Sequence, residues 1–181
     1  MLLTPNLQVN KITDITIKIL KENNIQAMIL DVDNTLIDLN REPLEGLKDW
    51  IDEMKSNGIK FCIASNSLKK DKIEKVAKML DIPYVHFSVK PTKIGLKKAK
   101  KILGVENNMN IAEVGDQLFT DVLGTNRMRM FSILTEPLCE EKVKINNLKR
   151  KLEKKVLKSQ KLKNKSWFET LTYINFKVWI F

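Results

Sequence analysis

The sequence AMILDVDNT, residues 27–35, joins a short apolar run to two aspartates that are one residue apart. Such a run predicts a buried strand with acids at its carboxyl end, where the ligand crevice of an open α/β sheet lies. Asp31 and Asp33 point to the same side of an extended segment, so they can converge on one reacting centre. Taken alone, however, the pattern is more typical of a strand end followed by an Asx-type turn.

Two carboxylates this close repel each other unless a cation lies between them or one of them is protonated. Mg²⁺ is a hard cation that takes oxygen ligands, so it would meet this need. The first motif is therefore compatible with a magnesium site.

Three later segments repeat the arrangement of an apolar run followed by polar residues. Strands are predicted at 60–64, 84–89 and 110–114. The polar residues that follow them are Ser65 and Asn66, then Lys90, then Asp116 and Asp121. Because parallel strands end at the same edge of a sheet, we expect these side chains to gather with Asp31 and Asp33.

The ordered set resembles the four motifs of the haloacid-dehalogenase-like (HAD) phosphatases: Asp-x-Asp-x-Thr, a Ser after the second strand, a Lys, and Gly-Asp-x(4)-Asp. Within that superfamily the chain is similar to class IIIA, the YqeG and phosphatidylglycerophosphate phosphatase group. The stretches that carry this closer resemblance are DVDNTL, SN, KP and GDQLFTDVLG. It covers roughly the first three quarters of the chain.

The resemblance implies a role for each motif residue. Asp31 would be the nucleophile and Asp33 the general acid and base. Ser65 and Lys90 would bind phosphate, with Asn66 as a further phosphate-binding candidate. Mg²⁺ would be held by Asp31, the main-chain carbonyl of Asp33, Asp116, and Asp121 directly or through water. His86, the sole histidine, falls in a predicted strand and is expected to be structural.

Alternating strands and helices predict an α/β fold, a HAD-like Rossmannoid three-layer α/β/α sandwich with a parallel sheet. We expect helices over 12–20, from Pro43 onward, over 73–80 and over 94–103, and a further strand over 131–134. The spacing of the motifs leaves no room for a sizeable cap domain, so the site should be open. Relatives usually carry Gly where this chain has Arg129; if that loop needs a positive φ, Arg129 adopts it poorly.

The chain of 181 residues has a formal net charge of +10, and this charge is unevenly spread. Residues 140–181 hold 12 Lys/Arg against 4 Asp/Glu, whereas the rest is almost neutral. We therefore divide the chain into a phosphatase core, 1–139, and a C-terminal arm, 140–181. Two distant cysteines, no signal-like N-terminus and no long apolar run indicate a cytoplasmic protein.

The arm combines a basic amphipathic helix, expected over 143–157, with an aromatic apolar tail, 167–181. This composition is typical of an interfacial membrane anchor, so the protein could be peripherally membrane-associated. A solvated helix, a tail packed on the core and a dimer contact explain the same pattern, and the alternatives stay open.

The leading hypothesis is a Mg²⁺-dependent phosphomonoesterase with a lipid head group, phosphatidylglycerophosphate, as substrate. A second hypothesis is a phosphatase for nucleic-acid ends or for a soluble sugar or nucleotide phosphate, with the basic arm following the phosphates. A third is a non-catalytic interaction module on the same scaffold. The intact acidic set argues against the third, because buried carboxylates without a function would be costly.

Overall fold

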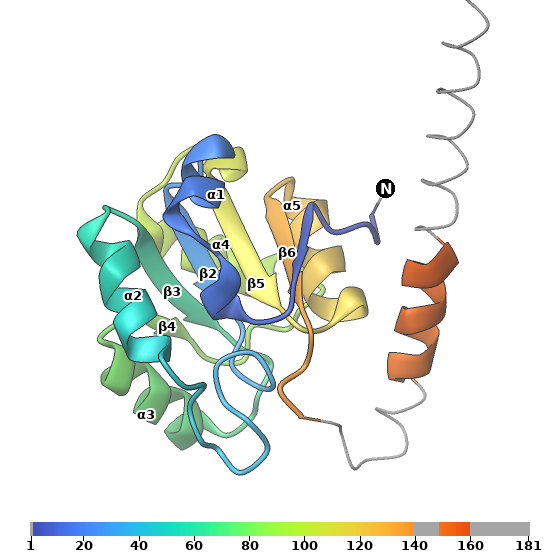
Figure 1. The fold of residues 1–181 in the computed structure, drawn as a ribbon, viewed down its shortest axis with the longest axis horizontal. Helices are drawn as coiled ribbons and strands as arrows, with labels where there is room; N and C mark the ends of the chain where they lie inside the picture. Colours follow the sequence, from blue (N-terminus) through green and yellow to red (C-terminus); the bar gives the residue numbers. More distant parts are fainter. Residues whose placement is uncertain (1, 140–148, 160–181) are drawn as a thin grey trace, which may run out of the picture. The chain divides into compact units, whose positions relative to one another are not determined.

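Six parallel strands form one sheet in the computed structural model, which describes residues 2–139 and 149–159 (Figure 1). The strand order is β1-β6-β5-β2-β3-β4. The strands are β1 (Leu7–Val9), β2 (Ala27–Leu30), β3 (Lys60–Ala64), β4 (Tyr84–Val85), β5 (Ile111–Gly115) and β6 (Phe131–Thr135). All of the described pairings are parallel, as the sequence predicts.

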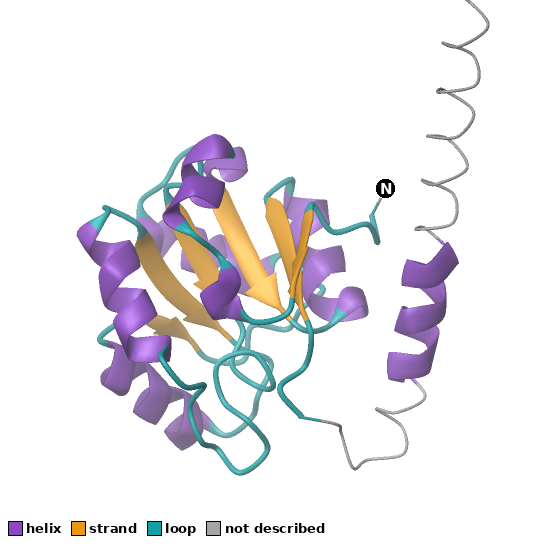
Figure 2. Ribbon diagram, viewed as in Figure 1, coloured by secondary structure: helices purple, strands orange, loops and turns teal. Residues whose placement is uncertain are grey.

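Helices cover both faces of this sheet and make a three-layer sandwich (Figure 2). On one face pack α1 (Ile17–Glu22), α2 (Leu47–Ser56) and α3 (Lys70–Leu80). On the other pack α4 (Ile94–Leu103) and α5 (Leu123–Met128). The predicted fold class is confirmed, and the residues described between the motifs form no cap domain.

Successive residues of β2 enter the two cores in turn, which explains why this strand is apolar throughout. Met28 and Leu30 belong to the core under α1, α2 and α3, whereas Ala27 and Ile29 belong to the core under α4 and α5. All four side chains are fully buried. A strand covered on both faces reads as a continuous apolar run rather than an alternating one.

Two predicted elements are wrong at their ends. Pro43 does not open a helix: it forms a bridge with Ile37 in a hairpin, and α2 begins only at Leu47, after Gly46 in a left-handed conformation. The predicted strand over 84–89 ends at Val85 because positive φ angles at Phe87 and Val89 break the extended chain. His86 therefore follows the strand instead of lying inside it.

Two further differences concern the N-terminal region. The helix expected over 12–20 is split into a 3-10 turn, Ile12–Asp14, and α1, whose first turn is capped by the Thr16 side chain. The short edge strand β1 was not predicted. It pairs with β6 in the register Leu7 to Ile133, and three residues give too little pattern to be recognised.

The order in which the chain adds strands to the sheet reverses at the β2–β5 boundary. From β2 it proceeds outward through β3 and β4, and then returns to β5 on the other side of β2. Such a switch point leaves a crevice at the carboxyl ends of the two strands. Asp31 follows β2 and Asp116 follows β5, so both acids lie at this crevice.

Contacts divide the chain into two units, Met1–Glu140 and Glu141–Phe181. Residues 149–159 of the second unit are helical, which agrees with part of the predicted basic helix. The rest of that helix and the aromatic tail, 167–181, lie outside the described residues. Among the helices that are described, none combines the length and apolar character needed to cross a bilayer.

Candidate active site

Strand register brings the polar residues of three motifs to one level. Leu30 pairs with Ile63 of β3 on one side and with Val114 of β5 on the other. The residues that follow these three positions include Asp31, Ser65 and Asp116. The Asp31 backbone N–H donates to the Val114 carbonyl at 2.9 Å, which fixes the nucleophile candidate at the end of the ladder.

Three buried aspartates form the centre of the site. Asp31, Asp116 and Asp121 each offer a carboxylate oxygen, and these oxygens all lie within 4.8 Å of one another. Gly115 makes this approach possible, because a Cβ at that position would lie 2.4 Å from Cγ of Asp121. Asp121 is held in a π-helical turn, Leu118–Val122, and accepts a 3.0 Å hydrogen bond from the Gln117 N–H.

Lys90 is buried in the middle of the acids. Its ammonium lies 2.7 Å from Asp121, 2.9 Å from Asp31 and 3.1 Å from Glu113, with 1% of the side chain exposed. Burial alone would lower the pKa of Lys90, but the carboxylates of Asp121, Asp31 and Glu113 outweigh it and raise this pKa well above its usual value. Lys90 is therefore a fixed positive charge that orients Asp31.

Glu113 is a member of the site that the sequence analysis missed. It lies inside β5 with 1% exposure, and its second oxygen accepts a short hydrogen bond from the Thr125 hydroxyl. Desolvation raises its pKa to about 8, although Lys90 opposes the shift. A signal was present: a glutamate stands in an otherwise apolar strand, and an acid at a core position needs a partner.

Burial also raises the pKa of Asp31 to about 6, with Lys90 acting in the opposite direction. Near neutral pH Asp31 is thus mostly ionised, while Glu113 is mostly protonated. Three converging carboxylate oxygens fit a hard divalent cation such as Mg²⁺.

Asp33 lies outside the buried triad. Its carboxylate is 47% exposed and is paired with the ammonium of Lys72, on the first turn of α3. Lys72 is a second residue that sequence reasoning missed, and one lysine among 32 basic residues gives no signal. An exposed carboxylate at the crevice can exchange protons with water, which suits a general acid and base.

Asn66 organises the backbone around Lys90. Its amide nitrogen donates to the Lys90 carbonyl at 2.8 Å, and its amide oxygen accepts from the Lys90 N–H at 2.7 Å and from the Ser88 hydroxyl at 2.9 Å. Val89 is held between these contacts with φ of 54°, which is strained for a β-branched residue. This arrangement favours a positioning role for Asn66 over direct phosphate contact.

Ser65 is buried beneath the same segment. Its hydroxyl accepts a 3.1 Å hydrogen bond from the Ser67 N–H, and its carbonyl accepts one of 2.8 Å from the Ser88 N–H. The hydroxyl proton is not used in these contacts, so it can be donated to a phosphoryl oxygen. The structure thus places Ser65 beside the Lys90 segment, as the motif order predicts.

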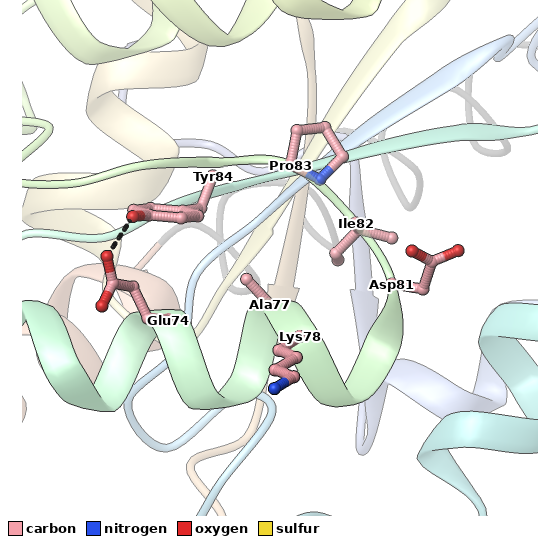
Figure 3. Close-up of a pocket in the computed structure, with 7 residues that line it drawn as sticks. All are labelled: Glu74, Ala77, Lys78, Asp81, Ile82, Pro83 and Tyr84. Carbon is pink, nitrogen blue, oxygen red and sulfur yellow. Dashed lines mark hydrogen bonds between the residues drawn. The ribbon is translucent and has the colours of Figure 1, made fainter.

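A surface hollow elsewhere on the core has no part in this chemistry. It lies between α3 and the start of β4 (Figure 3), whereas Asp31 and Asp116 follow the carboxyl ends of β2 and β5. Tyr84 donates to Glu74 across it at 2.6 Å. Its lining residues are Glu74, Ala77, Lys78, Asp81, Ile82, Pro83 and Tyr84, and none of them belongs to the four motifs.

A parallel sheet with this acidic switch-point site defines the class of HAD-like phosphatases. Comparisons with known proteins agree. Residues 1–140 match the family model described as mitochondrial PGP phosphatase. The chain is 33% identical over 160 residues to "Probable phosphatase YqeG" of Bacillus subtilis (strain 168), covering 88% of this chain and 92% of that relative.

Among solved structures, an uncharacterized protein from Listeria monocytogenes serotype 4b is similar in fold. It has a TM-score of 0.52 and 19% identity, covering 66% of this chain and 85% of that one. The chain belongs to the mitochondrial PGP phosphatase family of HAD phosphatases. It is therefore a phosphatase, and the predicted resemblance is confirmed.

Proposed function

We propose that this protein is a Mg²⁺-dependent phosphomonoesterase that acts through an aspartyl-phosphate and converts phosphatidylglycerophosphate to phosphatidylglycerol. The observation that carries the proposal is the convergence of Asp31, Asp116 and Asp121 around the buried ammonium of Lys90. The name of the family model supports the choice of substrate.

In the first step an Asp31 carboxylate oxygen attacks phosphorus. The bond from phosphorus to the ester oxygen breaks, and that oxygen takes a proton from Asp33. In the second step water attacks the aspartyl-phosphate, Asp33 takes the proton of the water, and phosphate leaves with Asp31 regenerated. Lys90 keeps Asp31 oriented through its 2.9 Å contact in both steps.

Asp31, Asp116, Asp121 and the main-chain carbonyl of Asp33 would hold the magnesium ion. When bound there, the ion offsets the repulsion between an anionic nucleophile and an anionic phosphate. Metal binding can be measured without turnover, through the melting temperature of the protein. A ligand that binds only the folded state raises this temperature. We expect Mg²⁺ to raise the melting temperature of the parent protein and not that of Asp116→Asn.

The open carboxyl edge of the sheet supports a large substrate. Between the first and second motifs the described chain contains only a hairpin, α2 and β3; between the second and third it contains α3 and β4. No described element covers the crevice as a cap would. A phosphate carried on a lipid at a surface can therefore enter the crevice that leads to Asp31.

The test is phosphate release from phosphatidylglycerophosphate in mixed micelles, with Mg²⁺ or with EDTA. Soluble phosphomonoesters and an oligonucleotide with 5′ or 3′ phosphate are assayed in parallel. Strong Mg²⁺-dependent preference for the lipid is expected. Preference for a soluble ester or for the oligonucleotide would overturn the substrate, and full activity in EDTA would overturn the metal.

A further inference from the structure

Three large apolar side chains are exposed on neighbouring loops at the carboxyl edge of the sheet. Leu68 is 76% exposed, Phe87 49% and Ile94 56%. We call these three residues the apolar rim. Leu68 lies on the connection from β3 to α3, whereas Phe87 and Ile94 lie on the connection from β4 into α4, which also carries the catalytic-site residue Lys90.

The two connections are joined by hydrogen bonds, so the segments that carry the apolar rim lie side by side. His86 Nε2 lies 3.3 Å from the Leu68 carbonyl, and the Ser88 N–H donates to Ser65 at 2.8 Å. The Gly95 N–H donates to the Ser88 carbonyl at 3.0 Å, which ties the start of α4 to the Phe87 segment. Ser65 and Lys90 belong to the same loops, so the rim borders the active site.

The loops that carry the apolar rim hold basic residues and no acidic ones. Residues 65–70 and 86–94 contain no Asp or Glu, and Lys69 and Lys93 are exposed beside the apolar side chains. The nearest acids along the chain, Asp71 and Glu74, are engaged with Arg41 and with Lys70 and Tyr84. Exposed apolar groups flanked by exposed cations are typical of surfaces that enter an anionic lipid interface.

We propose that the apolar rim is the face on which this phosphatase docks onto an anionic lipid surface. Leu68, Phe87 and Ile94 enter the interface, and Lys69 and Lys93 pair with lipid phosphates. This rests on the proposed lipid substrate, because such docking brings the open crevice and Asp31 to the depth of the head groups. It is separate from any contribution of the arm, 140–181.

Exposed apolar residues near the opposite edge of the sheet provide a matched control. Met79 is 38% exposed, Ile102 48% and Met109 70%. They lie near the ends of α3 and α4 and just before β5, away from the motif residues. The test variant is Leu68→Ser/Phe87→Asn/Ile94→Ser, with Asn chosen because it tolerates the positive φ of Phe87. The control variant is Met79→Ser/Ile102→Ser/Met109→Ser.

The experiment is co-sedimentation of the full chain with vesicles of phosphatidylglycerol and phosphatidylcholine, or of phosphatidylcholine alone. We expect binding to the anionic vesicles to fall about tenfold or more in the rim variant and to stay at the parent level in the control. Turnover of micellar lipid relative to a soluble ester should fall in parallel. Equal vesicle binding by the rim variant and the parent would overturn the proposal.

Charge reversal tests the same face without removing apolar groups. Lys69→Glu/Lys93→Glu should weaken binding by at least about fivefold per lysine at low salt, whereas Lys75→Glu/Lys101→Glu should have a smaller effect. These four side chains are exposed, so we expect the substitutions to leave the fold intact. Equal losses in the two pairs would mean that only the overall charge matters, and would overturn the assignment of this face.

Two further outcomes separate docking from the proposed function. If the parent hydrolyses micellar phosphatidylglycerophosphate but binds neither vesicle, docking is wrong and the function stands. If vesicle binding depends on the rim but only soluble esters are hydrolysed, the lipid substrate is wrong and docking stands on its own. A separate outcome would overturn the docking proposal. If the parent self-associates and the rim variant does not, the face is a contact between copies of the chain.

Discussion

The two edges of the sheet differ in how they use unusual backbone. At the amino edge a residue with positive φ follows the end of each of the helices α1 to α5 within two residues, and these residues are Asn24, Gly58, Asp81, Gly104 and Arg129. At the carboxyl edge the positive φ angles fall on Asn34, Arg41, Gly46, Phe87 and Val89, in the loops that follow β2 and β4; Gly46 is the N-cap of α2.

This difference separates what stabilises the fold from what makes it a phosphatase. A left-handed residue at a helix end satisfies the last carbonyls of the helix, so it contributes to folding. The left-handed Val89 does not follow a helix, so it satisfies no helix carbonyl. It persists because Asn66 holds the residues on either side of it. Strain of this kind, next to buried charges, is typical of functional sites.

The largest effect should follow from removing the proposed nucleophile at the carboxyl edge. Asp31→Asn should lower turnover on the order of 10³-fold or more, because an amide cannot form the aspartyl-phosphate. Asp49→Asn, on the exposed face of α2, is the control and should keep parent activity. Circular dichroism checks that both variants fold. Turnover within tenfold of the parent in Asp31→Asn would rule out the assigned nucleophile.

The two lysine–aspartate pairs at this edge should differ in how much they contribute to the free energy of unfolding. Lys90→Met leaves three buried carboxylates without their cation and should destabilise the protein by about 3–5 kcal/mol. Lys72→Met affects a pair in which Asp33 is 47% exposed, so the loss should stay below about 1 kcal/mol. Urea unfolding without metal measures both. Equal losses would contradict the contrast between a buried and a solvated pair.

The pH dependence of stability should report the buried acids. Because the pKa of Glu113 is raised to about 8, the folded state binds its proton more tightly than the unfolded state does. This contribution is complete below pH 4.5 and is lost as the pH rises through 8, with a limit of about 5 kcal/mol. Asp31, raised to about 6, adds a loss in the same direction at lower pH.

Glu113→Gln should therefore flatten the fall in melting temperature of the metal-free protein between pH 6 and 8.5. Glu53→Gln, on the exposed side of α2, should leave the fall unchanged. Differential scanning calorimetry across this range checks both variants. A parent protein whose melting temperature rises over the same range would contradict the protonated state of Glu113.

The contrast between the edges also explains how much of the fold and of the candidate site could be predicted from the sequence. The ends of β2, β3 and β5 were predicted to within a residue, as was the order of Asp31, Ser65, Lys90 and Asp116, because each motif follows an apolar run. The end of β4 was missed, because local propensity does not mark the positive φ at Phe87 and Val89; Val89 lies between two residues that Asn66 holds from another loop. Lys72 was missed because its partner is 39 residues away in the chain and a surface-type residue carries no periodic signal.

The loop after Asn126-Arg127 does require a positive φ, and Arg129 adopts it with φ of 57°. A left-handed conformation costs a residue with a Cβ about 1–2 kcal/mol, while Gly loses somewhat more backbone entropy on folding. Arg129→Gly should thus stabilise the protein by about 0.5–1 kcal/mol, or roughly 2–4 °C in melting temperature for a full 1 kcal/mol. Turnover should stay within a factor of two of the parent.

Val89→Gly relieves the strain of a similar positive φ at the carboxyl edge. Its effect on activity should differ from that of Arg129→Gly. The Lys90 segment depends on the stiffness of the residue between the two anchors of Asn66, so a flexible Gly there should reduce kcat even where stability rises. Melting temperature and turnover of the two Gly variants are measured side by side. If both variants gain stability with unchanged kcat, the strain at Val89 serves only the fold, and the two edges do not differ in the way argued above.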